Sequence, residues 1–235
     1  VDPDTDLSTW QNVSATLDAL KAGGEECPLV TAWQSWIHLE NFSAYHDVPF
    51  ASRDNGFAGT DTELMLNGDA QVAHLTAMGE WARDGKFIYT GRRNEGGANF
   101  RAGDCALFTE SSAGYAGISS EAEFDFDVRP LPYWDGVGNA PQNTIIGGAS
   151  LWVMEGHEDA EYKGVGEFLS FLSSSDVQAA WHQNTGYLPI TAEAGEATKA
   201  AGFYEQNPGT DIAVIQMTAK EPTANSKGLR LGSFD

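Results

Sequence analysis

The chain contains 235 residues, 41% of them hydrophobic and 20% charged, which is enough for one large globular domain or for two modest ones with their own cores. No run of uncharged apolar residues reaches the roughly 18 that a membrane-spanning helix needs, since the most apolar stretch covers only residues 144–154. Thirteen Lys and Arg against 34 Asp and Glu give a net charge of −21, which disfavours nucleic acids and anionic membranes as partners.

The first predicted elements are a helix and a strand. Residues 9–22 place their apolar side chains at helical spacing, with Ser8 as the expected N-cap and Gly23 with Gly24 as the stop. The short apolar run at residues 28–31 then predicts a buried strand.

A second amphipathic helix is predicted over residues 69–83, and Gly85 follows it as a C-terminal stop. Four side chains at helical spacing are expected to form its buried face: Val72, Leu75, Met78 and Trp81.

The rest of the chain continues to alternate between strands and helices. Strands are predicted at residues 106–109, 126–130 and 144–154. A pair of helices follows at residues 161–172 and 176–182. Helices that alternate with short strands indicate an α/β sheet protein.

Cys27 and Cys105 each stand at the start of a predicted strand. They would form a disulfide in an oxidising compartment, whereas two buried free thiols fit the sequence equally well. The sequence leaves this question open.

Sequence motifs of enzymes are largely missing. The five histidines show no HExxH spacing and no CxxC companion, so no metal site is expected. The glycine-rich segments contain neither a GxSxG elbow nor a P-loop or GxGxxG motif, so we expect no nucleophilic catalysis and no cofactor. One catalytic alternative is a glycoside hydrolase that uses Glu40, which follows Trp33 and Trp36. Such an enzyme needs a second carboxylate about 5–10 Å away across a cleft.

One long segment, residues 33–42 (WQSWIHLENF), resembles the WQxWIxLENF segment of the periplasmic glycerol-3-phosphate-binding proteins. Further segments similar to that family follow in the same order over nearly the whole chain: 49–52 (PFAS), 55–57 (NGF), 59–61 (GTD), 103–106 (GDCA), 140–143 (APQN), 145–154 (IIGGASLWVM), 181–183 (WHQ), 185–191 (TGYLPIT) and 227–232 (KGLRLG). Several of these are long and collinear, so the resemblance is specific.

The resemblance implies an α/β periplasmic-binding-protein fold of type II, in which two lobes close on a ligand by hinge motion. It implies that residues 1–143 form most of the second lobe, that residues 144–206 return through the first lobe, and that residues 207–235 re-enter the second. On that template the chain is truncated at both ends. Family contacts from Tyr, Glu and Ser would precede Val1, and a ligand-binding Arg would follow Asp235.

The family's ligand contacts carry over, residue by residue, to Trp33, Ser111, Gly148 and Tyr187. Trp33 would offer a rigid apolar face to the glycerol carbons, and Ser111, at a strand-to-helix junction, would offer a hydroxyl and free N–H groups to an anion. Gly148 would let the backbone approach a phosphate, and Tyr187 would donate its hydroxyl. Without the resemblance, these positions suit a core Trp, a helix N-cap, a strand bulge and a loop aromatic.

The implied function is that of a solute-binding component of an ABC importer. It would capture glycerol-3-phosphate or a glycerophosphodiester such as glycerophosphocholine in the periplasm, without catalysis, and would deliver it to the membrane subunits of the transporter. A sugar- or oligosaccharide-binding protein is the alternative within transport, because aromatic platforms beside polar groups also suit sugars. The acidic glycoside hydrolase is the alternative from another class.

Overall fold

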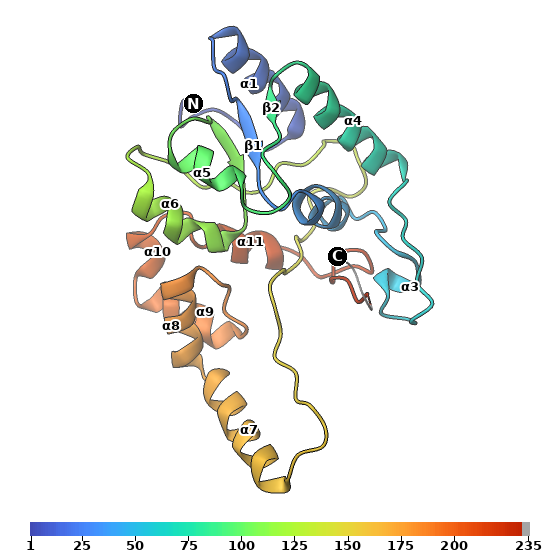
Figure 1. The fold of residues 1–235 in the computed structure, drawn as a ribbon, viewed down its shortest axis with the longest axis vertical. Coiled ribbons are helices and arrows are strands. Elements are labelled where there is room, and N and C mark those ends of the chain that lie inside the picture. The colour runs from blue at the N-terminus through green and yellow to red at the C-terminus, as the bar shows by residue number, and fades with distance from the viewer. Residues whose placement is uncertain (232–235) are drawn as a thin grey trace.

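A short parallel sheet organises the larger, upper part of the molecule in Figure 1. The computed structural model describes residues 1–231. The sheet has three strands, β1 (Leu29–Thr31), β2 (Phe87–Ile88) and β3 (Leu107–Thr109), in the order β2-β1-β3. Val30 of β1 pairs with Ile88 on one side and with Phe108 on the other, so all three strands end at the same edge. The α/β class expected from the sequence is confirmed.

Two helices supply most of the hydrophobic core beside this sheet. Helix α1 (Trp10–Ala22) and helix α4 (Asp69–Arg83) flank β1 and β2 in Figure 1. Their buried side chains form one cluster with the strands: Trp10, Val13, Leu17, Leu29, Met78, Trp81 and Phe87. Full burial of each large apolar side chain stabilises the fold by about 1.5–3 kcal/mol relative to exposure.

The two predicted helices have nearly the predicted bounds. Helix α1 begins one residue late because Thr9, and not Ser8, is its N-cap: the Thr9 hydroxyl accepts the N–H of Asn12 at 3.2 Å. Helix α4 has the predicted bounds, but Val72 and Leu75 are 44% and 43% exposed.

Polar side chains replace these two apolar residues on the buried face of α4. Gln71 and His74 are buried there beside Met78 and Trp81. The Gln71 amide donates to the Ser43 hydroxyl at 3.1 Å and to the Pro49 carbonyl at 3.1 Å. A buried polar side chain is tolerated when its hydrogen bonds are satisfied, so the helix turns this face inward.

The remaining helices are mostly short. Between β1 and α4 lie a π-helix and two α-helices: η1 (Trp36–Asn41), α2 (Phe42–Tyr45) and α3 (Ser52–Asn55). Around β3 lie α5 (Gly96–Arg101), η2 (Ser112–Gly114) and α6 (Tyr115–Glu121). The later part of the chain contains α7 (Asp159–Leu172), α8 (Ser175–Thr185), α9 (Ala192–Ala200), α10 (Phe203–Gln206) and α11 (Ile212–Thr218). The predicted helix pair corresponds to α7 and α8.

Two of the predicted strands are wrong. Residues 126–130 and 144–154 contain no strand in the described chain, although the strands predicted at 28–31 and 106–109 are present and one residue shorter. The 144–154 segment is bonded to the body of the molecule at its start, where the Thr144 N–H donates to the Gln216 carbonyl at 3.2 Å and the Ile145 N–H donates to the Asn41 side chain at 2.9 Å. At its end, the Met154 carbonyl accepts the hydroxyl of Tyr162 in α7 at 3.2 Å. Beyond Ile145 the segment is extended and exposed, because the described chain provides no strand for it to pair with.

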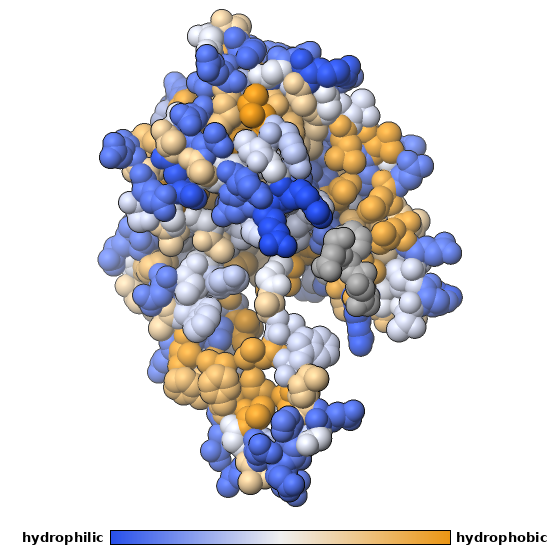
Figure 2. Space-filling view, in the orientation of Figure 1, coloured by the Kyte–Doolittle hydropathy of each residue, from blue (hydrophilic) through white to orange (hydrophobic). Residues whose placement is uncertain are grey.

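Exposed apolar side chains gather around this segment and the helices beside it. Figure 2 shows them on the narrow lower part of the molecule, where Figure 1 places α7 to α9. They include Leu151, Trp152, Phe168, Phe171 and Ile190, and Trp152 is 83% exposed. An apolar patch of this kind is typical of a surface that another part of a protein covers.

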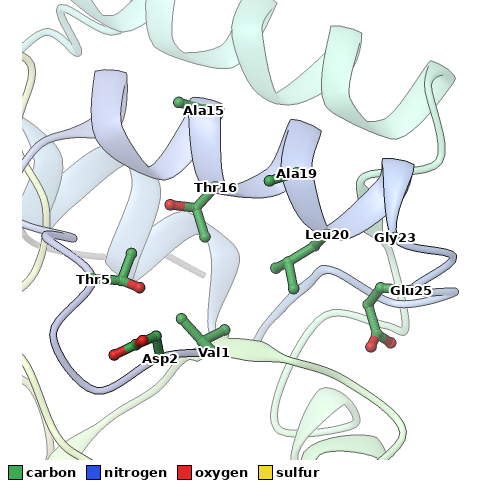
Figure 3. A pocket seen from close by; sticks show the side chains of 9 residues that line it. All are labelled: Val1, Asp2, Thr5, Ala15, Thr16, Ala19, Leu20, Gly23 and Glu25. Atoms are coloured by element: carbon green, nitrogen blue, oxygen red, sulfur yellow. The ribbon is translucent and has the colours of Figure 1, made fainter.

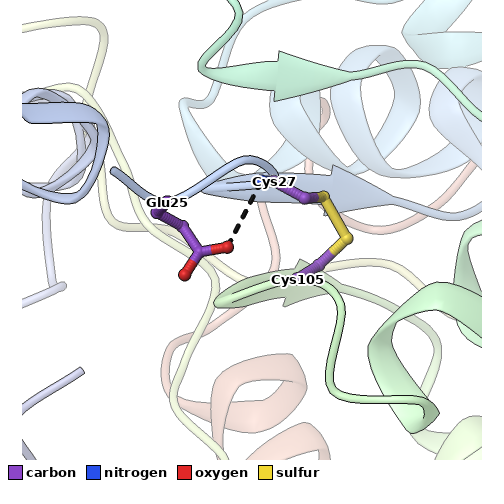
Figure 4. Close-up of a disulfide and its surroundings, with 3 residues drawn as sticks. All are labelled: Glu25, Cys27 and Cys105. Atoms are coloured by element: carbon purple, nitrogen blue, oxygen red, sulfur yellow. Dashed lines mark hydrogen bonds between the residues drawn. A yellow bond between two sulfur atoms is a disulfide. The ribbon is translucent and has the colours of Figure 1, made fainter. Parts of the chain in front are cut away.

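Cys27 and Cys105 form a disulfide that links the starts of β1 and β3 (Figure 4). A carboxylate oxygen of Glu25 accepts the N–H of Cys27 at 3.3 Å. The bridge joins residues 78 apart in the sequence, and closure of a loop of that length removes about 4.5 kcal/mol of unfolded-chain entropy. The question that the sequence left open is answered in favour of the disulfide.

Among the described residues, no helix is long and apolar enough to cross a membrane.

A chain of hydrogen bonds between uncharged side chains, with two buried histidines at its centre, connects α4 and η1 to the end of β1. The Trp134 indole donates to Nδ1 of His74 at 3.0 Å, and Nε2 of His74 lies 3.1 Å from Nδ1 of His38. Nε2 of His38 lies 3.1 Å from the Thr31 hydroxyl at the end of β1. Because the indole can only donate, the neutral rings donate in one direction, from His74 to His38 and from His38 to Thr31.

The pKa values of the buried imidazoles reflect this arrangement. Burial lowers the pKa of His38 to about 3 and that of His46 to about 4. Burial, together with the nearby His38 and His46, holds the pKa of His74 well below its usual range. A neutral imidazole in the native state that becomes charged on unfolding makes the protein sensitive to acid.

Stability is therefore expected to fall as the pH falls from about 6.5 towards the native pKa values near 3 and 4, and to be fully present above about 6.5. The unfolding free energy should fall by about 3–4 kcal/mol between pH 6 and pH 5, because all three histidines take up protons on unfolding. Urea unfolding at pH 7, 6 and 5 measures this slope. His46→Gln should remove about a third of it, and His157→Gln, at an exposed position, should leave it unchanged. A stability that is flat from pH 7 to pH 5 would contradict this account.

Candidate functional site

The loops that leave the three parallel strands meet at one edge of the sheet. Trp33 lies two residues after β1, and Ser111 lies two residues after β3. The loop after β2 reaches the same place, because the Arg93 carbonyl accepts the N–H of Trp33 at 2.9 Å. The carboxyl edge of an open parallel sheet is the usual position of a ligand site.

Trp33 has an unusual backbone conformation. Its φ is +47°, in the left-handed region that large side chains rarely adopt. Its N–H is held by Arg93, and its carbonyl accepts the N–H of Ile37 at 2.9 Å. The side chain is 37% exposed and is not a core residue. The surrounding hydrogen bonds thus maintain a strained backbone that keeps an indole at the surface of the site.

Ser111 is a helix N-cap at the start of η2, as the strand-to-helix junction predicted. Its hydroxyl accepts the N–H of Ala113 at 3.3 Å. Its own N–H is not free, because it donates to a carboxylate oxygen of Glu110 at 2.7 Å. The N–H of Ser111 itself is therefore not available to a ligand, and a carboxylate occupies that position.

Glu110 belongs to the same surface as Trp33 and Ser111, called here the ligand wall, although no sequence motif points to it. The Trp33 side chain donates a hydrogen bond to its carboxylate, so Glu110 links Trp33 to Ser111. Burial raises the pKa of Glu110 to about 7, and the hydrogen bonds from Ser111 and Trp33 and the charge of Arg101 oppose that rise. Its position directly after a predicted strand was the one available signal, and 34 acidic residues made it impossible to single out.

Tyr187 reaches the same wall through its neighbour Gly186. The Ser112 hydroxyl donates to the Gly186 carbonyl at 3.1 Å, which joins the end of α8 to η2. Nδ1 of His182 lies 2.8 Å from the Tyr187 carbonyl and fixes the loop from inside α8. The Tyr187 side chain is 51% exposed. Its backbone is held while its ring and hydroxyl remain accessible.

Gly148 belongs to the extended 144–154 segment and lies beside Tyr187. A Cβ built on Gly148 would lie 3.5 Å from Cε1 of Tyr187, and the φ of Gly148 is +98°. The preceding Gly147 lies against Trp36, since a Cβ there would come within 2.9 Å of the indole. The segment is not a strand, so the reading of Gly148 as a strand bulge is wrong.

A continuous series of contacts therefore brings all four predicted residues together. It runs from Trp33 through Glu110 to Ser111, and from the adjacent Ser112 through Gly186 to Tyr187 and Gly148. The series joins the body of the molecule to segments that lie more than thirty residues away along the chain. Such an arrangement can present an indole face, hydroxyls and a carboxylate to one small ligand.

Other candidate sites do not join this series. Glu40 lies in η1, where burial raises its pKa. Within residues 1–231, no group of three or more His, Cys, Asp or Glu side chains is placed to hold a metal ion. An open hollow of about 530 Å³ lies between the N-terminal segment and α1, lined by residues such as Val1, Thr16 and Leu20 (Figure 3). None of the four predicted contacts lines it.

Comparison with known proteins places these observations in context. Residues 3–210 match the family of bacterial extracellular solute-binding proteins. The sn-glycerol-3-phosphate-binding periplasmic protein UgpB of Yersinia pestis is 50% identical over 234 residues, which cover 100% of this chain and 53% of the relative. The chain thus spans about half the length of the curated relatives that it matches.

Two solved structures share the fold. UgpB from Mycobacterium tuberculosis in complex with glycerophosphocholine has a TM-score of 0.73 at 20% identity, covering 93% of this chain and 53% of that one. The maltose/maltodextrin-binding domain MalE from Bdellovibrio bacteriovorus, bound to maltotriose, has a TM-score of 0.66 at 16% identity, covering 94% and 57%. The expected periplasmic-binding-protein fold, of which this chain forms part, is confirmed.

The contact between Gly186 and Ser112 can be tested by adding a methyl group. Gly186 has a φ of +76°, and a Cβ there would lie 2.8 Å from the Ser112 carbonyl oxygen. Gly186→Ala should therefore lower the unfolding free energy by about 2–3 kcal/mol, from backbone strain and the displaced loop. Gly24→Ala is the matched control, because Gly24 has a φ of +94° with nothing within 4 Å of its Cβ position. Gly24→Ala should lower the unfolding free energy by about 1 kcal/mol, from backbone strain alone. Equal losses in urea unfolding would show that the contact with Ser112 is unimportant.

Proposed function

The chain belongs to the family of bacterial extracellular solute-binding proteins, and from this we propose that it is part of the solute-binding component of an ABC importer that captures glycerol-3-phosphate or a glycerophosphodiester. The observation that carries the proposal is the convergence of Trp33, Ser111, Gly148 and Tyr187 on one wall. Relatives named for glycerol-3-phosphate binding are about half identical to this chain along its whole length. The proposed location is the periplasm, and the proposed partners are the membrane subunits of the transporter.

In this function the protein binds its ligand without changing it. The wall described above supplies one side of the site, and closure of a second lobe over it would enclose the ligand. The division into 1–143, 144–206 and 207–235 is part of this proposal, and its last four residues lie outside the described part of the chain. The exposed apolar side chains of 144–154 and α7 support it, because they mark a surface that a first lobe would cover.

The net charge of −21 does not argue against an anionic ligand. Exposed carboxylates act weakly beyond about 8–10 Å at ordinary salt concentrations, whereas hydroxyls and backbone N–H groups act at contact distance. A bound phosphate therefore depends on the local groups of the cleft.

Calorimetric titration of the full-length protein with glycerol-3-phosphate, glycerophosphocholine and maltotriose tests this function. We expect the two phosphorylated glycerols to bind and maltotriose not to bind. The 235-residue chain alone should bind at least tenfold more weakly, because half a cleft leaves the ligand hydrated. Binding of maltotriose alone would favour the sugar-binding alternative. Turnover of a glycoside would favour the hydrolase. Equal affinity of the full-length protein and the 235-residue chain would show that this wall is a complete site.

Trp33→Ala in the full-length protein should weaken binding of glycerol-3-phosphate by about 1–3 kcal/mol, because the indole face against the glycerol carbons is lost. Phe57→Ala is the control: Phe57 is an exposed aromatic residue, 43% exposed, that contacts Lys227 and lies outside the series of contacts. Its replacement should leave the affinity unchanged. The same affinity in Trp33→Ala and the wild type would assign Trp33 a structural role.

A further inference from the structure

The carboxylate of Glu110 is fixed in the ligand wall. One of its oxygens accepts the N–H of Ser111 at 2.7 Å, and the Trp33 side chain donates to the same carboxylate. Its aliphatic part packs against the backbone of Gly114, where a Cβ would come within 2.5 Å of the Glu110 Cγ. Two of these contacts come from the turn that follows Glu110 and one comes from the loop after β1, so the carboxylate cannot swing out of the wall without breaking them.

The charge of this carboxylate is not neutralised within the protein. Glu110 forms no ion pair with any residue of the described chain. Arg101 is the cation that acts on it, but its guanidinium is already paired with Glu121 at 2.8 Å. An ionised Glu110 therefore leaves a negative charge facing the position where the proposed ligand lies.

We propose that Glu110 is a specificity-determining residue, whose carboxylate acts with the Trp33 indole to favour glycerophosphodiesters that carry a cationic head group over the phosphomonoester glycerol-3-phosphate. This inference rests on the proposed function of the same wall. It adds a preference between glycerol-3-phosphate and the glycerophosphodiesters, which the proposed function does not distinguish.

The preference follows from the charges of the ligands. A phosphomonoester carries about −1.5 to −2 at pH 7, and a diester carries −1. A quaternary ammonium head group brings the net charge of the diester to zero, and places a cation where a carboxylate and an exposed indole attract it. A fixed negative charge thus repels the monoester most, repels an uncharged-head diester less and attracts the cationic head group.

The backbone contact of Ser111 supports the same preference. Its N–H would be a donor for a phosphate oxygen if Glu110 did not occupy it. The N–H of Ser111 is therefore not available to bind a phosphate, and the carboxylate of Glu110 lies at its position. A site built for a dianion alone would gain affinity from the opposite arrangement.

The test measures the affinities of glycerol-3-phosphate, glycerophosphoglycerol and glycerophosphocholine at pH 8 in the full-length protein. The wild type should bind glycerophosphocholine at least tenfold more tightly than glycerol-3-phosphate, with glycerophosphoglycerol between them. Glu110→Gln keeps an oxygen acceptor for the indole and should reduce the tenfold ratio to under threefold, mainly because glycerol-3-phosphate binds more tightly. Glu80→Gln removes the same charge from the exposed face of α4 and should leave the ratio unchanged.

The outcomes separate this inference from the function on which it rests. If both ligands bind and Glu110→Gln keeps the wild-type ratio, the specificity role of Glu110 is wrong while the proposed function stands. If no phosphorylated glycerol binds the wild type, the proposed function fails, and this inference fails with it.

A measurement on the wild type keeps the test decisive if Glu110→Gln does not fold. Glycerophosphocholine and glycerophosphoglycerol do not change charge between pH 8 and pH 6, whereas burial places the pKa of Glu110 at about 7. The groups packed against Glu110 are Trp33, Ser111 and Gly114, which do not titrate in this range, and the charged groups nearby are Arg101 and its partner Glu121. Protonation of Glu110 should therefore reduce the preference for the choline ester by at least threefold at pH 6. A preference that does not change with pH would overturn the inference.

Discussion

The end of the parallel sheet is held by hydrogen bonds between uncharged side chains, and the proposed ligand wall depends on them. The chain from Trp134 through His74 and His38 reaches Thr31 at the end of β1, and the Thr109 hydroxyl at the end of β3 donates to Thr31 at 2.6 Å. Each ring accepts at one nitrogen and donates at the other, so a proton added to either ring removes an acceptor. Because Trp33 lies two residues after β1 and Glu110 directly after β3, the buried network fixes the positions from which both side chains face the proposed site.

The wall combines one constrained part with one weakly supported part. Trp33, Glu110 and Ser111 lie within two residues of strand ends of the sheet, whose core and disulfide hold them in place. Gly148 belongs to a segment that is extended, exposed and bound to the body mainly at its start. A protein that closes on a ligand needs a rigid surface and a partner that moves against it.

Much of this arrangement can be predicted from the sequence, and the failures have physical causes. The sequence predicts the bounds of helix α4 correctly, because the spacing of its apolar residues and the glycine that follows it act locally. It does not predict the buried face of this helix, since the hydrogen bonds of His74 depend on residues far away in the sequence. The segment 144–154 has the composition of a strand, yet pairing needs a partner that composition does not reveal. The resemblance predicts four contact residues, and one series of contacts links them in the structure. No sequence motif points to Glu110, because its contact with Trp33 joins loops that follow different strands.

The most direct test of the central claim is to follow the indole N–H signals of the seven tryptophans by NMR while glycerophosphocholine is added to the full-length protein. The account predicts a large shift for Trp33, whose indole is bonded to Glu110 and borders the proposed site, and little change for Trp134, whose indole is bonded to the buried His74. A saturating ligand that leaves the Trp33 signal in place would show that the ligand binds elsewhere and that this wall is not the site.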